Sequence, residues 1–273
     1  MFVLPEDRPA LMGILNVTPD SFSDGGLHFE KEAAIAAALQ MVEDGADLID
    51  VGGESTRPGA DEVSPDEETR RVVPVIEALV ESGVEVSIDT RKPEVALQAL
   101  YAGASVLNDV SGLRDPAMVE VAASDDCTVC IMHMQGEPHT MQVEPFYEDV
   151  VGEIRQYLVD TAKRAERRGI ARERLWIDPG IGFGKTLEHN LEILRSLDVF
   201  RRTGYPVLIG VSRKSFIGKL LPHDGKSAPA DDRLEGTLAA QLLAQLQGVR
   251  IIRAHDVKAA RRTIDFAAAF LAG

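Results

Sequence analysis

The sequence predicts an α/β protein folded as a single (β/α)8 TIM barrel, and three observations lead to that prediction. Short apolar runs alternate with helical segments along the chain. Polar residues follow each apolar run. The length of 273 residues suits one such barrel, for which about 250 residues are typical. A doubly wound open sheet is the alternative that the same alternation allows.

Eight apolar runs are short, rich in Val, Ile and Leu, and bounded by polar residues or glycine, which favours strands. They are residues 10–15, 47–52, 85–89, 105–109, 128–133, 175–178, 206–211 and 249–254. Eight strands alternating with helices predict a parallel sheet, and at this length a closed barrel accommodates them all. The sequence shows no linker or low-complexity tract, so we expect one domain spanning residues 1–273.

Helical periodicity fills the segments between these runs, as in residues 31–45, 65–83 and 231–248. Several of these segments end in glycine, the usual residue just past a helix. We expect residues 146–169 to form a long additional helical segment before the sixth strand. Residues 222–232 predict an exposed, mobile loop.

The composition argues against two classes of partner. A formal net charge of −15 disfavours nucleic acid and membrane surfaces, because both attract basic patches. The N-terminal residues lack a basic segment followed by an apolar stretch, and no run approaches the roughly 20 apolar residues of a membrane span. We therefore expect a cytoplasmic protein.

Two motifs invite functional interpretations that their surroundings do not support. Cys127 and Cys130 are spaced as in redox pairs and zinc sites, but Cys127 directly precedes and Cys130 lies within a predicted strand, where residues three apart face opposite ways. The string PGIGFGK (179–185) resembles a phosphate loop. Pro179 occupies the first glycine of a Walker A motif, and Lys185 occupies the last glycine of a dinucleotide fingerprint. We exclude both nucleotide motifs.

Polar residues gather where the predicted strands end. In an α/β barrel all eight carboxyl ends meet on one face, which carries the active site. The residues at these ends are Asn16, Glu54, Ser55, Thr56, Arg57, Asp89, Asn108, Asp109, His133, Gln135, Asp178, Ser212, Arg213, Lys214, Arg253, His255 and Asp256. Fold stability alone gives no reason for such a gathering, so the pattern predicts a ligand site.

The chain resembles the dihydropteroate synthase family in eight strings that occur in the family's order. They are MGILNVTPDSFSDGG (12–26), DVGGESTRPGA (50–60), SIDTRKPEVA (87–96), NDVSGLRD (108–115), IMHMQG (131–136), IDPGIGFGKT (177–186), GVSRKSFIG (210–218) and IRAHDV (252–257). The first two are the most specific. Departures are a short N-terminal leader, an unmarked 222–232 loop, and Ala254 where valine is expected.

This resemblance implies a pterin-binding barrel that condenses 6-hydroxymethyl-7,8-dihydropterin diphosphate with p-aminobenzoate and releases diphosphate. It also implies a Mg²⁺ cofactor, a homodimer and inhibition by sulfonamides. The implied pterin residues are Asp89, Asn108, Met134, Asp178 and Lys214. The implied diphosphate residues are Asn16, Thr56, Arg57, Arg253 and His255, with Asn16 also on the metal. The implied p-aminobenzoate residues are Phe22, Thr56, Pro58, Phe183, Lys214 and Ser215.

The implied catalytic groups are Asp89, Lys214, Arg57, Arg253 and His255. An aromatic amine is already a neutral nucleophile, whereas the leaving diphosphate meets several cations. We therefore expect a dissociative, S_N1-like path in which the C–O bond breaks first. Two alternatives share the barrel: a corrinoid-type pterin methyltransferase domain and a catalytically silent pterin-binding paralogue. The anion-binding residues argue against both.

Each assignment has a structural alternative. Asp178 can cap the turn at Pro179, and Asn108 and Asp89 can be satisfied polar groups at strand ends. Arginines most often form surface ion pairs, phenylalanines most often pack in cores, and Lys214 at a barrel mouth also suits a Schiff base. The histidines His28, His139, His189 and His223 are expected on the surface or in loops.

Overall fold

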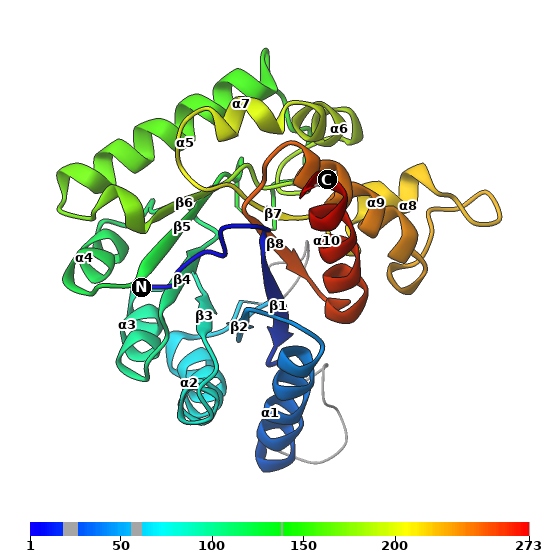
Figure 1. Cartoon of the computed structure of the whole chain (residues 1–273). Coiled ribbons are helices and arrows are strands. Elements are labelled where there is room, and N and C mark those ends of the chain that lie inside the picture. The colour runs from blue at the N-terminus through cyan, green and yellow to red at the C-terminus, as the bar shows by residue number, and fades with distance from the viewer. Residues whose placement is uncertain (19–26, 56–61, 138, 273) are drawn as a thin grey trace.

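The computed structural model describes residues 1–18, 27–55, 62–137 and 139–272, with the side chains of residues 27–30 outside that description. Its strands are β1 (Ala10–Asn16), β2 (Leu48–Gly52), β3 (Val86–Asp89), β4 (Val106–Asp109), β5 (Thr128–Met132), β6 (Leu175–Asp178), β7 (Leu208–Gly210) and β8 (Ile251–Ala254). Every predicted strand is present. Helices surround the strands on the outside (Figure 1).

The helices alternate with the strands. They are α1 (Leu27–Glu43), α2 (Pro65–Glu81), α3 (Pro93–Tyr101), α4 (Pro116–Ser124), α5 (Val150–Arg167), α6 (Leu187–Arg195), α7 (Leu197–Arg201), α8 (Ser215–Leu220), α9 (Leu234–Leu246) and α10 (Val257–Ala272), with 3₁₀ turns at Arg172–Arg174 and Ala230–Asp232. Proline begins α2, α3 and α4, where its missing N–H has no helical partner to lose.

The strands form one parallel sheet in the order β6-β5-β4-β3-β2-β1-β8-β7. The first strand pairs in parallel with the last, with Ala10 of β1 opposite Ile251 of β8. The remaining gap between β6 and β7 is bridged at Ile177 and Val207, where Ile177 N–H donates to Pro206 O at 3.0 Å. The barrel prediction is confirmed, as a nearly closed barrel, and the open-sheet alternative is wrong.

The closing contact also explains why β7 is shorter than predicted. Pro206 lies in the predicted strand but has no N–H, so it accepts a bond and donates none. Val207 forms an isolated bridge with Ile177 and accepts from the N–H of Ile251 at 3.1 Å, and the paired ladder with β8 begins at Leu208. Strand β8 likewise starts at Ile251 rather than 249, because the turn that closes α9 after Leu246 continues through Gly248, whose φ is 83°.

Apolar side chains pack in two layers on either side of the sheet. The inner layer fills the barrel and comprises Ala10, Met12, Leu48, Val106, Cys130, Trp176, Leu208 and Ile251. Phe2 packs edge-on against Trp176, with ring centroids 5.9 Å apart. The outer layer lies between strands and helices, and it contains Cys127. The two thiols are therefore buried in different layers, so the structural interpretation of the C-x-x-C spacing is confirmed.

Two expectations need correction, and the one for residues 222–232 is largely confirmed. The segment 146–169 is not an additional helix: α5 is the regular crossover between β5 and β6. The 222–232 loop is exposed as predicted, apart from the buried Ala228, and it contains a bridge between His223 and Lys226. His189 is not a loose surface residue: it completes the capping box of α6, and its ring packs edge-on against Tyr147 at 5.0 Å.

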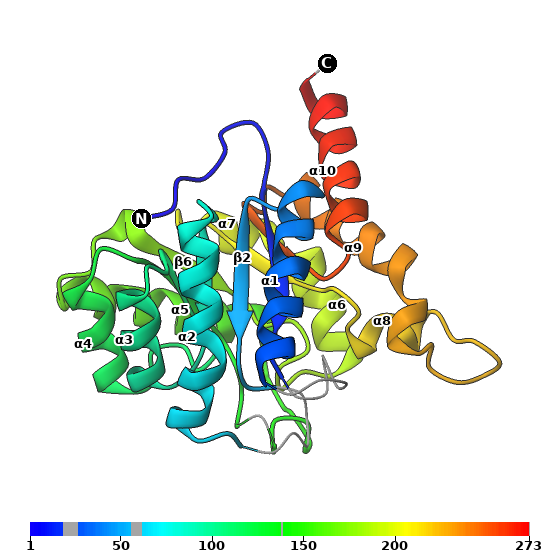
Figure 2. The same cartoon turned by 90° about the horizontal axis from the view of Figure 1, so that it is seen from below.

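The helices and strands together place the carboxyl ends on one face. Figure 2 shows β2 running toward the lower edge of the view, away from both chain termini. Inward-facing Gly52 and Gly210 end β2 and β7 on that face, and a Cβ on either would reach only ordinary contact with Asp89 or Arg253. These glycines leave space above the inner core layer, between the strand ends.

Candidate functional site

The described residues predicted for the site all lie at or just past the carboxyl ends of the strands. They are Asn16 on β1, Asp89 on β3, Asn108 on β4, Met134 after β5, Asp178 and Phe183 at and after β6, Lys214 and Ser215 after β7, and Arg253 and His255 at and after β8. Predicted residues Phe22, Thr56, Arg57 and Pro58 lie outside the described residues. The barrel thus collects groups that lie up to 239 residues apart in the sequence, the separation between Asn16 and His255.

One polar network joins side chains from β2, β3, β4 and β8. Arg253 Nη2 donates to Asp89 Oδ2 at 2.7 Å, and Arg253 Nε donates to Asp50 Oδ2 at 2.6 Å. Asn108 Nδ2 donates to the same Asp50 oxygen at 3.0 Å. The second oxygens of Asp50 and Asp89 have no hydrogen-bond partner among the described residues. Two carboxylates thus share one guanidinium, with acceptor capacity left over.

The network shifts the pKa values of its members. Burial raises the pKa of Asp89 to about 7, with Arg253 opposing the rise and Asp50 adding to it. Burial also acts against the charge of Arg253, yet Asp50 and Asp89 together raise its pKa above the ordinary value. Perturbed groups of this kind, gathered at one strand edge, are typical of functional sites.

Asp178 at the end of β6 and Lys214 after β7 influence each other electrostatically. Asp178 is buried, and its Oδ1 accepts from Gly180 N–H at 2.7 Å. Burial raises the pKa of Asp178, and Lys214 counteracts the rise. Burial lowers the pKa of Lys214 to about 8, and Asp178 counteracts that fall. Lys214 Nζ donates to Ile181 O and lies 4.3 Å from the centre of the Phe183 ring.

The glycines of PGIGFGK serve close packing rather than phosphate binding. Gly180 has a φ of 70°, and a Cβ there would collide with the carbonyl oxygen of His133. Gly182 has a φ of 82°, and its Cβ would lie 3.0 Å from Lys214 Cδ. Only glycine allows the loop after β6 to approach both neighbours so closely.

Lys185 is a buried residue that the sequence did not assign to the site. Its Nζ donates to Phe183 O at 2.8 Å and to His133 O at 3.3 Å, and lies 3.0 Å from His133 Nδ1. Burial lowers the pKa of Lys185 well below its ordinary value. Burial and the nearby Lys185 both lower the pKa of His133. Lys185 therefore ties the loop after β6 to the loop after β5.

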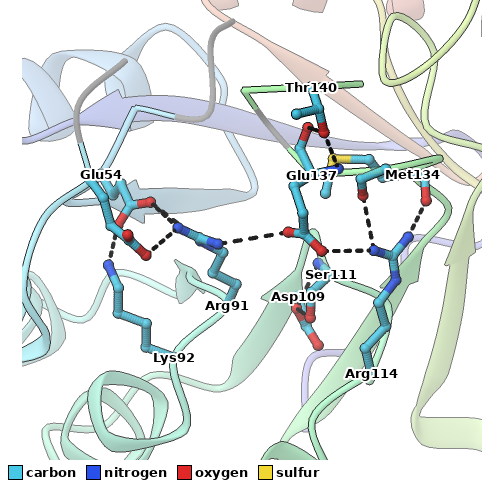
Figure 3. A network of polar contacts seen from close by, with 11 residues as sticks. Glu54, Arg91, Lys92, Asp109, Ser111, Arg114, Met134, Glu137 and Thr140 are labelled. Carbon is cyan, nitrogen blue, oxygen red and sulfur yellow. Dashed lines mark hydrogen bonds and ion pairs between the residues drawn. The ribbon is translucent and has the colours of Figure 1, made fainter. Parts of the chain in front are cut away.

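Met134 belongs to a small apolar cluster beside the network. It packs with Val110, Met132 and Met141, and Phe183 lies against the cluster. Its carbonyl oxygen accepts from Arg114, which also donates to Gly136 O at 2.9 Å (Figure 3). This cluster gives the site an apolar wall adjoining the charged groups.

Glu54, which follows β2, is held by two cations. It accepts from Arg91 Nη2 at 3.1 Å and from Lys92, which also pairs with Glu68 at 2.5 Å. Arg91 in turn reaches Glu137, 3.8 Å away on the loop after β5 (Figure 3). These ion pairs join the loops after β2, β3 and β5, so Glu54 is accounted for structurally.

The loops after β7 and β8 are also joined. Arg213 has a φ of 58°, an uncommon value for a residue with a side chain, and pairs with Asp256 at 2.5 Å. His255 donates through its backbone N–H to Ser212 Oγ at 3.1 Å, and its Nδ1 lies 3.0 Å from the same oxygen. Ser215 is exposed at the start of α8.

The part of the chain that the structure describes contains no group of three or more His, Cys, Asp or Glu side chains arranged to hold a metal ion. None of its helices has the length and apolarity that crossing a membrane requires.

Comparison with known proteins agrees with this geometry. The pterin binding enzyme family matches residues 12–255. Dihydropteroate synthase of Escherichia coli K12 is 50% identical over 252 residues, covering 92% of this chain and 88% of the relative. Dihydropteroate synthase of Bacillus subtilis is 44% identical over 255 residues, covering 93% of this chain and 85% of the relative.

Solved structures give the same result. Yersinia pestis dihydropteroate synthase, solved with a sulfonamide drug, is 44% identical to this chain with a TM-score of 0.93. The match covers 100% of this chain and 98% of the Yersinia chain. The Xanthomonas albilineans enzyme, solved with 7,8-dihydropteroate, is 44% identical with a TM-score of 0.89, and the match covers 99% of this chain and 96% of the Xanthomonas chain.

Proposed function

Because the chain belongs to the dihydropteroate synthase family, we propose that the carboxyl ends of its barrel strands are where its two substrates meet. The chain has the dihydropteroate synthase activity of that family, a transferase activity of folate biosynthesis. The substrates are 6-hydroxymethyl-7,8-dihydropterin diphosphate and p-aminobenzoate. The observation that carries the proposal is the pair of buried charged clusters, around Asp178 and around Arg253, at one end of the barrel.

The pterin is assigned to the clusters of Asp178, Lys214, Asn108 and Asp89. Its 2-amino and N3 groups form an edge of donors, which a buried carboxylate at Asp178 satisfies. Lys214, whose Nζ donates, suits the acceptors O4 and N5 on the opposite edge. Asn108 completes the amino edge, Asp89 lies toward the ring, and Met134 supplies an apolar wall. The electrostatic influence of Lys214 on Asp178 supports this arrangement.

The diphosphate is assigned to Asn16, Thr56, Arg57, Arg253 and His255. Arginine presents a planar fork that matches phosphate oxygens. Asn16 offers an amide oxygen to a Mg²⁺ ion that would take its other ligands from water and phosphate, as Mg²⁺ commonly does. The ion would supply positive charge to the leaving group. Removing metal with EDTA should abolish turnover, and Mg²⁺ should restore it; full activity in metal-free buffer would contradict this proposal.

The p-aminobenzoate is assigned to the space beside Phe183, Lys214 and Ser215, together with Phe22, Thr56 and Pro58. Ser215 begins α8, so its backbone N–H and hydroxyl can both donate to the carboxylate of the substrate. The Phe183 ring, held under Lys214, supplies a flat apolar surface for the aromatic ring. This arrangement directs the amine toward the CH2 group of the pterin.

We propose a dissociative path in which the C–O bond to diphosphate breaks before the amine attacks. Arg253 and His255 face charge that grows on the leaving oxygens, an interaction stronger in the transition state than in the substrate. Asp89 has an oxygen without a hydrogen-bond partner among the described residues, and it faces the proposed ring site, where a cation delocalised over the dihydropterin would develop. A secondary deuterium isotope effect above unity at the CH2 is expected, and an effect near unity would contradict the dissociative step.

One assay tests the function as a whole: release of diphosphate should require both the pterin diphosphate and p-aminobenzoate. A corrinoid-type methyltransferase domain would release none. A silent paralogue would bind the pterin without turnover. Release of diphosphate in the absence of p-aminobenzoate, at the same rate, would contradict the condensation.

We further propose that residues 1–273 form one cooperatively folding domain and that the chain is a homodimer of the cytoplasm. The exposed side chains Leu243, Leu246, Phe266 and Phe270 lie on α9 and α10, and the two phenylalanines are 72% and 74% exposed. A monomer rarely leaves such apolar groups in water. Light scattering should give twice the monomer mass, and Phe266→Glu should lower it; a wild-type monomer would contradict the dimer.

A further inference from the structure

Asp50 is a buried carboxylate whose partners are all residues assigned above to substrates. It lies on β2 among inward-facing positions, between Leu48 in the inner core layer and Gly52 at the mouth. It has no solvent exposure. Burying a charge is costly unless hydrogen bonds compensate it, so the partners of Asp50 indicate what it is for.

Those partners come from two other strands. Asn108 Nδ2 on β4 and Arg253 Nε on β8 both donate to Asp50 Oδ2, at 3.0 and 2.6 Å. Arg253 continues through Nη2 to Asp89 on β3. Asp50 Oδ1 has no hydrogen-bond partner within the described parts of the chain. A single carboxylate on β2 therefore sets the position of side chains from β4 and β8 and, through Arg253, of Asp89.

We propose that Asp50 is a positioning residue of the pterin site, which fixes the orientation of the Asn108 amide and holds Arg253 against Asp89. This inference rests on the proposed function, since it acts through residues assigned there to the pterin and the diphosphate. Asp50 itself lies below them, at the level of the inner strand positions, and need not touch the substrate.

The orientation of Asn108 follows from the chemistry of a carboxylate. An ionised carboxylate only accepts hydrogen bonds, so the side of Asn108 that faces Asp50 must be its NH2 group. The carbonyl oxygen and the second N–H of Asn108 are then presented to a ligand in a fixed order. That order matches an amino group beside a ring acceptor, as in the 2-amino and N1 pair of a pterin. A ring with the reverse order would meet mismatched groups.

Asp50 also tunes the charge of the site. Asp89 is faced by Arg253 from β8, Asp50 from β2, Glu68 from α2, Asp109 from β4, and Lys214 from the loop after β7. Asp50 adds to the rise in the pKa of Asp89. Neutralising Asp50 should therefore lower the pKa of Asp89 and move the acid limb of the pH profile to lower pH. A residue that served only the fold would not move this limb.

The first variant is Asp50→Asn, which keeps shape and removes charge. Its matched control is Asp47→Asn, just before the amino end of the same strand, where Asp47 accepts from Arg8 at 2.6 and 2.7 Å and from Leu11 N–H at 2.8 Å. Calorimetry should show pterin binding weakened about tenfold or more in Asp50→Asn, the loss of one oriented hydrogen bond or more. Asp47→Asn should bind pterin as wild type does.

The second variant, Asn108→Asp, leaves Asp50 intact and remains informative if Asp50→Asn does not fold. It sets two acceptors against each other, and protonation of either carboxyl restores a donor. Pterin binding should therefore be weak at neutral pH and should recover, relative to wild type, as the pH falls. A pH-independent ratio to wild type would overturn the inference.

A double-mutant cycle measures the coupling directly. If Asp50 acts through Asn108, the loss in Asp50→Asn with Asn108→Ala is smaller than the sum of the two single losses. Fully additive losses, or wild-type pterin binding by Asp50→Asn, would overturn the inference. Asp178→Ala separates this failure from that of the proposed function. Wild-type pterin binding by Asp178→Ala and Asn108→Ala would refute the site itself. Loss of binding in those two variants, with wild-type binding by Asp50→Asn, would refute only the role of Asp50.

Discussion

Replacing Asp178 by asparagine should abolish tight pterin binding without destabilising the fold. The side chain is buried, and its Oδ1 accepts from Gly180 N–H at 2.7 Å. An asparagine keeps that bond through its carbonyl oxygen. It replaces the other acceptor with an NH2 donor, which would face the donor edge of the pterin.

The structure sets the size of the effect. Leaving one buried donor without an acceptor costs about 1–3 kcal/mol, and the pterin edge carries two such donors at N3 and the 2-amino group. Asp178→Ala removes both acceptors, so we expect a loss of about 2–6 kcal/mol, or about 30-fold to 10⁴-fold in affinity. Asp178→Asn should fall within this range because one acceptor becomes a donor.

Stability should change in the opposite sense. Burial raises the pKa of Asp178, which means that the folded state disfavours its ionised form. A neutral amide of the same shape avoids that cost, so the melting temperature of Asp178→Asn should equal or exceed that of wild type at pH 7. Titration calorimetry with the pterin and thermal melting would be measured on the same preparation. Wild-type affinity in Asp178→Asn would refute the assignment, and a large fall in melting temperature would make Asp178 a structural residue.

The remaining predictions concern a titration, a loop and an inhibitor. Burial lowers the pKa of Lys214 to about 8, so its ammonium is lost as the pH rises through 8 and kcat/KM for the pterin should decline there. Lys214→Arg stays charged and should show no such decline, whereas a wild-type profile flat to about pH 9.5 would count against the role of Lys214. Lys185→Met leaves the carbonyls of Phe183 and His133 without this donor, so the free energy of unfolding in urea should fall by about 1–3 kcal/mol. The KM for p-aminobenzoate should also rise more than the KM for the pterin, and equal changes in the two KM values would argue that Lys185 does not position Phe183. Substitution of Phe22 or Pro58 should raise the inhibition constant of a sulfonamide more than the KM for p-aminobenzoate, and equal changes would contradict that part of the pocket.

The fold could be predicted closely because each strand carries its own boundary signals. Strand β6 was predicted at the residues where it lies, 175–178, between the 3₁₀ turn at Arg172–Arg174 and Pro179. The errors have physical causes. Pro206 and Val207 look like strand residues locally, but their pairing depends on how far the barrel closes between β6 and β7, which no local pattern encodes.

The site could be predicted in part because barrel geometry itself brings the strand ends together. The sequence could not identify Asp50, since it stands inside an apolar run rather than at its end. Its partner Arg253 is 203 residues away. One signal was available. Asp50 and Gly52 are two residues apart on one strand, so the two positions face the same side of the sheet, here the barrel interior. Lys185 was missed because its three contacts depend on two loops folding against each other.

The most direct test of the account is the position of the product on the enzyme. A crystal structure of this chain with 7,8-dihydropteroate should show the 2-amino and N3 groups of the pterin within about 2.7–3.2 Å of the Asp178 carboxylate, the usual hydrogen-bond range. The aminobenzoate ring should lie beside Phe183, with its carboxylate near Ser215. A product bound away from the carboxyl ends of the strands, or with its pterin turned so that Lys214 meets the amino edge, would contradict the account.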